Sequence, residues 1–451
     1  MTKMDNIKTT IEFVNHASVL ITYGKVGILS DPWYSKSVFH NGWRLLYENS
    51  EDYIDKVLDN TTHIYLSHEH PDHFNPAYLL NKKIQNKIIQ KKIIFIFQKT
   101  KDRRVVSFLE SKGFKCIEFD QSKNKINQDV EIQIVKHDFY DSSISIKTPD
   151  TKILNLNDCP LRDIFQIKRF KKKYGTFDVL LTQFSYAAWK GGENGKVIRE
   201  NAAKEKLLDI LNQTKILKCK KVIPFASYIY FSNRLNFYMN DSVNTPQEVY
   251  NYLSKNSLNP IIMKPEEKQF LNQLKQNKSS LDFWEDKFQF DNNNKNLDTY
   301  EKKYKLDDIQ KEFTKYQKKI FDKNSKALIY FLHKLNFLGA FQKINILFVD
   351  NKNNYEYSIF SGIKKTDNKN YDISMHSESL SFIFKNEFGF DTLTVNGCFE
   401  CAPQNFSKVS KTLAIGSLNA MGLKLNLGII FKLDVILLFL KKLIVFLRKL
   451  K

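Results

Sequence analysis

Short apolar stretches alternate with stretches of helical character over roughly the first 262 residues of the chain. The runs 93–97, 105–109 and 179–183 are each too short to form more than one element, and apolar runs of this length are typical of buried strands. Strands that alternate in this way with helices predict a sandwich of two sheets flanked by helices.

The pattern changes beyond this part of the chain. The stretch 263–304 turns polar and rich in asparagine, which predicts a linker with helical patches. From 305 to 424 the pattern predicts a small α+β domain, with strands at 344–348 and 355–359 and a helix near Leu380. We assign no chemistry to this second domain.

The last segment, 425–451, predicts a basic amphipathic helix. Its charged side chains share about a third of the helix circumference, while Leu, Ile and Phe cover most of the rest. The uninterrupted apolar run 435–440 is far shorter than the roughly 20 residues that span a bilayer. Two alternatives stay open: a helix lying in the plane of an anionic inner membrane surface, and a terminal helix docked on its own domain or on a second copy.

Length and composition define the class of protein. The 451 residues, 42% hydrophobic and 14% aromatic, suffice to bury a substantial core and predict two domains. A net charge of +21 favours an anionic partner such as a phosphorylated small molecule, a lipid or a membrane surface, although scattered lysines also suit a solvated surface. The sequence lacks zinc-finger spacing and RNA-recognition signatures, which argues against nucleic acid as a partner.

Cysteine usage and the first residues bear on the compartment. Five cysteines without disulfide-framework spacing indicate a reducing environment, and Cys398-Phe399-Glu400-Cys401 fits a pair of ordinary thiols better than a metal site. The opening residues are polar and do not form a signal peptide. We therefore expect a cytoplasmic protein, attached peripherally to the inner membrane if the terminal helix binds lipid.

The segment His68-Glu69-His70-Pro71-Asp72-His73 follows the strand-like stretch 62–67 and holds four metal-capable side chains. Imidazole nitrogens with a carboxylate oxygen suit zinc, iron or manganese in a site that also holds water. A loop leaving a strand end can direct His68 and His70 at one ion, and Asp72 with His73 at a second. The alternative is a polar turn that collects three of the nine histidines by chance. The segment predicts bound divalent metal.

The spacing His-x-His-x-Asp-His after a strand resembles the metallo-β-lactamase superfamily. Further stretches are similar, in the same order, to the metallo-β-lactamase part of CMP-N-acetylneuraminate hydroxylase: 13–21, 29–33, 42–46, 153–159, 224–228 and, more weakly, 389–393. The resemblance implies a catalytic αββα sandwich over residues 1–262, within a chain of the α+β class.

The resemblance also implies further site residues. His137, at the end of an alternating stretch, matches a first-site metal ligand, and Asp158 at another strand end can bridge two ions or cap the turn before Pro160. His16 matches a position beside the pocket, where it assists catalysis or remains a hydrogen-bonded core residue. Asp31 orients a metal-binding histidine or forms a turn.

Charged residues near the motif suggest how a substrate is bound and activated. Asp72 is a candidate to accept a proton during catalysis. Arg44, Lys190 and Arg234 lie in stretches that resemble the family, so they are candidates for attracting an anionic substrate, although each also suits a solvated surface. The sequence therefore predicts a metal centre with basic groups near its entrance.

Two departures from the family affect the chemistry. The hydroxylases carry an N-terminal Rieske cluster, which needs two cysteines and two histidines. Here the first strand is expected within the opening residues and the first cysteine is Cys116, so we expect no Rieske cluster. The last metal-binding histidine of the superfamily is replaced by Phe225-Ala226-Ser227, which leaves the number of ions open at one or two.

Two reactions fit these residues. Metal-bound hydroxide supports hydrolysis of a phosphorylated substrate, whether a phosphoester, a nucleotide-sugar or a lipid. The same ligands could hold iron for hydroxylation of a nucleotide-linked sugar, as the resemblance implies, but that reaction requires a separate electron-donor partner. Because no Rieske centre is expected, hydrolysis ranks first. A degenerate fold that only binds ligands ranks last, because most of the expected metal ligands are present.

Overall fold

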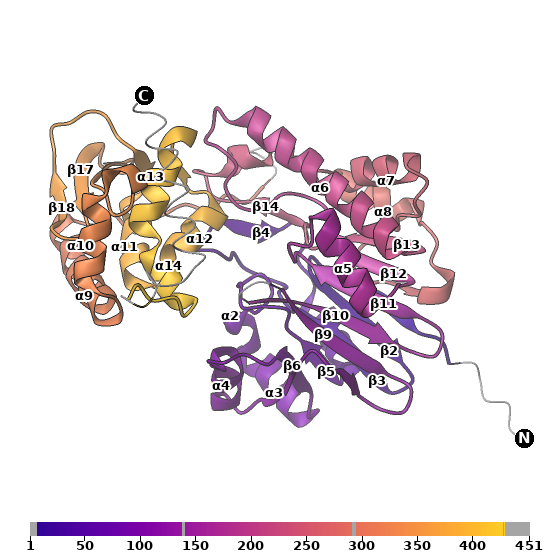
Figure 1. Ribbon diagram of the computed structural model, residues 1–451. Helices are drawn as coiled ribbons and strands as arrows, with labels where there is room; N and C mark the ends of the chain where they lie inside the picture. Colours follow the sequence, from indigo (N-terminus) through magenta and orange to yellow (C-terminus); the bar gives the residue numbers. More distant parts are fainter. Residues whose placement is uncertain (1–6, 138–139, 291–294, 427, 429–451) are drawn as a thin grey trace, which may run out of the picture.

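The computed structural model describes residues 7–137, 140–290, 295–426 and 428 (Figure 1). The predicted basic helix at 425–451 therefore lies largely outside the described residues. Among the helices that are described, none has both the length and the apolar character needed to cross a bilayer.

The first layer is a seven-stranded sheet in the order β15-β1-β2-β3-β5-β6-β7. Its strands are β1 (Thr10–Asn15), β2 (Ser18–Tyr23), β3 (Val26–Ser30), β5 (His63–Tyr65), β6 (Ile94–Gln98), β7 (Lys115–Phe119) and β15 (Glu267–Phe270). Strands β3 and β5 are parallel neighbours, with Ser30 opposite Tyr65. The loops that leave these two strands therefore start at the same edge of the sheet, and one of them carries the histidine motif.

The second layer is a six-stranded sheet in the order β13-β12-β11-β10-β9-β8. Its strands are β8 (Lys123–Lys125), β9 (Glu131–His137), β10 (Asp141–Lys147), β11 (Lys152–Asn157), β12 (Val179–Gln183) and β13 (Lys221–Phe225). Strands β11, β12 and β13 run parallel, so the segment after Asn157 also leaves at a carboxyl edge. A separate ribbon pairs β4 (Trp43–Leu45) with β14 (Ile229–Phe231).

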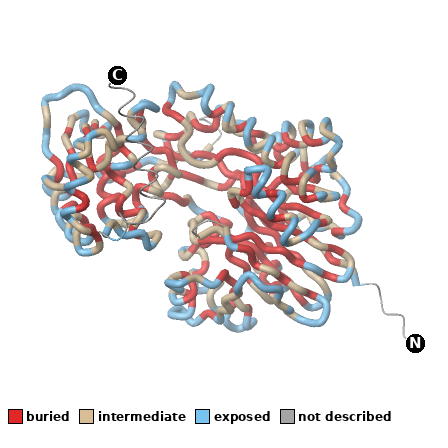
Figure 2. The backbone as a smooth tube through the Cα atoms, viewed as in Figure 1, coloured by how far each residue is buried: buried red, intermediate tan, exposed pale blue. Residues whose placement is uncertain are grey.

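Helices cover the outer faces of both sheets, and the sheets bury their inner faces against each other (Figure 2). The first sheet is covered by α1 (Glu51–Asp59), α2 (Pro76–Leu79), α3 (Lys82–Gln90) and α4 (Arg104–Ser111), and the second by α5 (Ile164–Tyr174), α6 (Lys196–Leu217), α7 (Pro246–Lys255) and α8 (Lys278–Lys287). This arrangement is the predicted αββα sandwich.

The apolar runs divide between strands and a helix. Runs 93–97 and 179–183 contain β6 and β12, whereas the run 105–109 lies in α4 and is not a strand. Val105, Val106 and Leu109 are buried together on one face of α4. A five-residue apolar run satisfies the spacing of a buried strand and of a buried helix face equally well, so its periodicity cannot distinguish them.

Within the stretch 263–304, predicted as a linker with helical patches, β15 and α8 pack in the sandwich, whereas Tyr300 lies in the core of the C-terminal unit. Strand β15 pairs with β1 at the edge of the first sheet, and Thr10 lies opposite Phe270. In α8, Trp284 is fully buried, its ring stacks on Tyr228 at 4.2 Å, and its indole nitrogen donates a hydrogen bond to the carbonyl of Met263 at 2.9 Å. Polar residues dominate the composition, but a few apolar side chains suffice to anchor the segment.

The C-terminal unit has its own sheet and core, as the predicted small α+β domain requires. Its sheet has the order β18-β17-β16-β19-β20, with β16 (Ile344–Phe348), β17 (Asn353–Ser358), β18 (Gly362–Lys365), β19 (Ile373–Met375) and β20 (Phe399–Glu400). Its helices are α9 (Leu306–Lys323), α10 (Lys326–Lys334), α11 (Ser377–Lys385), α12 (Gly389–Asn396), α13 (Pro403–Leu413) and α14 (Ile415–Ala420). Figure 1 shows α12 and α14 on the side of this unit that faces the sandwich.

Candidate metal centre

The histidine motif is held against the end of β3 by Asp31, whose side chain is 1% exposed. The Asp31 carboxylate accepts hydrogen bonds from the backbone nitrogen and the hydroxyl of Ser67, both at 2.8 Å, and one from the Asn157 side-chain amide. Its Oδ2 atom also lies 3.1 Å from Nδ1 of His73. This contact fixes the imidazole ring and leaves Nε2 to face the cluster, which is the geometry of a residue that orients a metal ligand.

Two groups of side chains could each hold a metal ion, and they share His73: one consists of His16, Asp72 and His73, and the other of His68, His73 and Asp158. Within each group the ligand atoms lie within 4.8 Å of one another. Nε2 of His73 lies 3.2 Å from Oδ2 of Asp72 and 3.7 Å from Oδ2 of Asp158. His16 and His68 complete the two groups at 3.4 Å and 3.7 Å from the same carboxylate oxygens.

The buried atoms of these groups fit a divalent metal. Both ring nitrogens of His16, Oδ1 of Asp72 and Oδ1 of Asp158 are buried and make no hydrogen bond. A buried polar atom without a partner costs free energy, so native structures rarely keep several of them in one place. Imidazole nitrogen and carboxylate oxygen are ligands for zinc, iron and manganese, and a bound ion would satisfy these atoms together.

Burial and the carboxylates control the charge of the imidazoles. Burial lowers the pKa of His68 to about 3, so this ring is neutral and can offer a lone pair to a metal. Burial also opposes the charge on Asp72, but the neighbouring His73 and His16 hold the pKa of its carboxyl well below the usual range. Asp72 is therefore an anion in the interior, where a cation is strongly favoured.

His70, which the motif predicts as a ligand of the first ion, lies beside the cluster and belongs to neither group. Its Nδ1 lies 3.0 Å from Nε2 of His68, and its Nε2 lies 3.9 Å from Oδ2 of Asp391 in α12. Burial lowers the pKa of His70, but the nearby carboxylates of Asp391, Asp72 and Asp158 raise it to about 9. His70 thus links the candidate centre to the C-terminal unit.

His137, predicted as a third histidine ligand, belongs to neither of the two groups found among the described residues. Nε2 of His137 lies 2.9 Å from the Ser143 hydroxyl, and its ring is nearly parallel to that of Phe170 in α5, with the centroids 5.8 Å apart. The side chain therefore packs toward the helix that covers the second sheet. Its position at a strand end is as expected, but strand alternation directs it to the other face.

His16 contributes more than its sequence position indicates. It follows β1 with a positive φ of 20°, a conformation uncommon for residues other than glycine, and its ring is 3% exposed. The resemblance placed it only beside the pocket, whereas the structure places it in one of the two candidate groups. A lone histidine in a turn carries no spacing signal, so the sequence could not predict this role.

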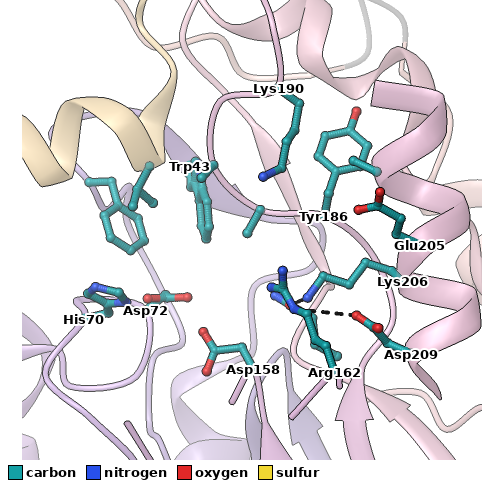
Figure 3. Close-up of a pocket in the computed structure, with 16 residues that line it drawn as sticks. Trp43, His70, Asp72, Asp158, Arg162, Tyr186, Lys190, Glu205, Lys206 and Asp209 are labelled. Carbon is teal, nitrogen blue, oxygen red and sulfur yellow. Dashed lines mark hydrogen bonds and ion pairs between the residues drawn. The ribbon is translucent and has the colours of Figure 1, made fainter. Parts of the chain in front are cut away.

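A cavity of about 190 Å³ opens directly on Asp72 and Asp158 and is basic on its opposite wall (Figure 3). Arg162, Lys190 and Lys206 line that wall. Arg162 is paired with Asp209 at 3.5 Å, and burial, with the nearby Arg162, lowers the pKa of Lys206 to about 8. The carboxylates of Glu205 and Asp209 lie on the same wall, so the side of the cavity opposite Asp72 and Asp158 carries three cations and two anions.

Of the three predicted substrate-binding cations, the structure places Lys190 in this cavity and the other two elsewhere. Arg44 donates two hydrogen bonds to Asp298, at 2.7 and 2.8 Å, so its charge is already neutralised. Arg234 has an exposed side chain and lines none of the described cavities near the cluster. Arg162 and Lys206 were missed, although Arg162 follows Asp158 by only four positions.

Comparison with known proteins gives matches to the sandwich. The chain is 24% identical over 277 residues to cytidine monophosphate-N-acetylneuraminic acid hydroxylase of Danio rerio, covering 57% of this chain and 44% of that protein. It is also 24% identical over 265 residues to the human protein named as an inactive form of that hydroxylase, covering 55% of this chain and 51% of that one. The predicted resemblance to this hydroxylase is confirmed. The chain spans about half the length of the curated relatives it matches.

Among solved structures, a metallo hydrolase from Ignicoccus hospitalis matches with a TM-score of 0.40 and 16% identity, covering 58% of this chain and 97% of that protein. The diiron β-hydroxylase CmlA from Streptomyces venezuelae matches with a TM-score of 0.39 and 12% identity, covering 58% of this chain and 54% of that protein. No family model matches the chain.

Proposed function

We propose that this chain is a metal-dependent hydrolase that acts on a substrate with a phosphoryl group. The proposal rests on the cavity in Figure 3, where three basic side chains face Asp72 and Asp158 across a space large enough for a phosphoryl group. Zinc, iron or manganese bound by the two histidine and aspartate groups, as one ion or two, would supply an activated water and polarise the phosphoryl oxygen.

The chain's own residues would share the remaining work. Arg162, Lys190 and Lys206 bind and orient the anionic group, which holds the reacting bond at the edge of the metal cluster. Asp72 would offer one carboxylate oxygen to the metal, and its other oxygen would accept the proton of the attacking water. His16, 3.4 Å from the other oxygen of Asp72, keeps that carboxylate in place.

A second candidate is iron-dependent hydroxylation of a nucleotide-linked sugar. The names of the similar proteins favour it, because one is named cytidine monophosphate-N-acetylneuraminic acid hydroxylase and the other an inactive form of that enzyme. The same histidines and aspartates suit iron, but this reaction also needs electrons from a separate redox partner. The identity of the metal and the need for a reductant therefore distinguish the two candidates.

The test is metal analysis of protein purified without oxygen, followed by assay with bis(p-nitrophenyl) phosphate. We expect the purified protein to contain zinc or manganese and to hydrolyse this phosphodiester without an added reductant. Asp72→Asn should lower kcat by roughly 10²- to 10⁴-fold in protein whose metal content is measured alongside, because it removes both the proton acceptor and one carboxylate ligand. Lys190→Met should raise KM by about tenfold with little change in kcat, since it removes one charged hydrogen-bond donor.

The exposed aspartate Asp286 provides the matched control, and Asp286→Asn should leave both kinetic constants unchanged. The second candidate would be established instead if the purified protein contains iron, does not hydrolyse the phosphodiester, and turns over a nucleotide-sugar only with an added electron donor. Protein that retains no metal at all would leave only a ligand-binding module.

A further inference from the structure

A second and larger cavity, of about 730 Å³, lies on the other side of the histidine motif. The sandwich forms one wall of it and the C-terminal unit forms the other. Six apolar side chains that line it are Phe74, Val105, Phe108, Phe382, Phe388 and Met421. Its volume is within the range of roughly 300–1,000 Å³ that is typical of small-molecule sites.

Several charged groups of this cavity are already paired, and much of its lining is apolar. Arg104 donates a hydrogen bond to Glu69 at 2.7 Å and lies over the ring of Tyr140 at 4.2 Å. Asp391 lies 3.9 Å from His70. Phe388 is 53% exposed and lines the cavity, where its ring lies edge to face with that of Phe382 at 6.2 Å between centroids. An apolar surface held open in this way favours an apolar ligand.

The two cavities meet at the metal cluster. His70 and Phe39 line both of them, and Asp72 and Asp158 lie on the basic side. A molecule with an anionic head between Arg162 and Lys190 and an apolar chain beside Phe108 and Phe388 would run past the rings of Phe39 and His70, which pack edge to face beside the cluster with centroids 5.7 Å apart. Its phosphoryl bond would then lie at Asp72 and Asp158, where the proposed hydrolysis takes place.

We infer that the substrate is an anionic amphiphile, a phosphorylated lipid-type molecule whose head group occupies the basic cavity and whose hydrocarbon chain occupies the apolar cavity. This inference rests on the proposed function and names its substrate class. A nucleotide-sugar is polar at both ends, so it would leave the apolar walls in contact with water or with polar groups.

The test is calorimetric titration of the full-length, metal-loaded chain with alkyl phosphates from butyl to decyl, each below its micelle concentration. We expect affinity to rise about fourfold per added methylene, from roughly 0.8 kcal/mol per buried CH₂, until the cavity is filled. Phe388→Glu should abolish most of this dependence on chain length. Lys190→Met should weaken binding equally for every chain length.

The matched control is Phe165→Glu, because Phe165 is 75% exposed on α5 and lines neither cavity. Circular dichroism checks the fold, and Met421→Glu replaces Phe388→Glu if the latter does not fold. The inference is overturned if affinity does not depend on alkyl chain length, or if this dependence remains in Phe388→Glu and in Met421→Glu. Either result leaves the proposed phosphoryl site intact. Chain-length dependence with no effect of Lys190→Met keeps the apolar site but removes the phosphorylated substrate.

Discussion

Asp31 is the residue on which the geometry of the candidate centre most depends. Its carboxylate is buried, accepts hydrogen bonds from Ser67 and Asn157, and lies 3.1 Å from Nδ1 of His73, the ring that both metal groups share. We predict that Asp31→Asn lowers metal affinity by roughly 10- to 100-fold, because the amide cannot reproduce the acceptor pattern that orients His73. Competition with a metal-binding dye measures the affinity.

The control at the same scale is Asp163→Asn. Asp163 is exposed and caps the N-terminus of α5, and asparagine caps a helix about as well as aspartate. Its metal affinity should stay at the wild-type value. Equal affinity in Asp31→Asn would show that His73 is held by the rest of the loop instead.

The helix α8 shows how an element with a polar sequence becomes part of the core. Its residue Trp284 is fully buried and contacts Tyr228 and Phe13. We predict that Trp284→Ala lowers the free energy of unfolding of the sandwich by about 3–5 kcal/mol, as expected for a large aromatic ring removed from a core. Denaturant titration measures this loss.

Asp286→Ala on the exposed face of the same helix should change the free energy of unfolding by no more than about 0.5 kcal/mol. A small loss in Trp284→Ala would restore the linker interpretation.

At the scale of the whole molecule, the sandwich and the C-terminal unit are joined by aromatic contacts. Trp189 of the sandwich stacks on Phe399 and Phe406 with ring centroids 5.0 and 4.7 Å apart, and its backbone nitrogen donates to the carbonyl of Thr394 at 2.8 Å. We predict one calorimetric unfolding transition for the intact chain and two for Trp189→Ala, because loss of these contacts uncouples the units.

The control is Phe331→Ala, because the ring of Phe331 on α10 is 52% exposed, and this variant should keep the single transition. Two transitions in the unaltered chain would contradict the coupling.

Features that depend on neighbouring residues could be predicted from the sequence. Three such features are local patterns: the histidine motif, the position of Asp158 at a strand end, and the alternation of short strands with helices that predicts the sandwich. Each can be recognised because the period of a strand and the loop that follows it involve adjacent positions. The small C-terminal α+β domain follows from the same kind of pattern. Lys190 was found through the resemblance, since it lies in a stretch that is similar to the family.

Features that depend on contacts between distant segments required the tertiary structure. Arg44, a predicted substrate-binding cation, is paired with Asp298, which lies 254 positions further along the chain, and the sequence alone could not indicate this pairing. The ring of His137 lies against Phe170 of α5, and His16, in the turn after β1, lies in one of the two candidate groups. The apolar cavity exists only where α12 and α14 approach the motif. Composition and the spacing of residues show which side chains the chain contains, but only packing determines which of those side chains share a site.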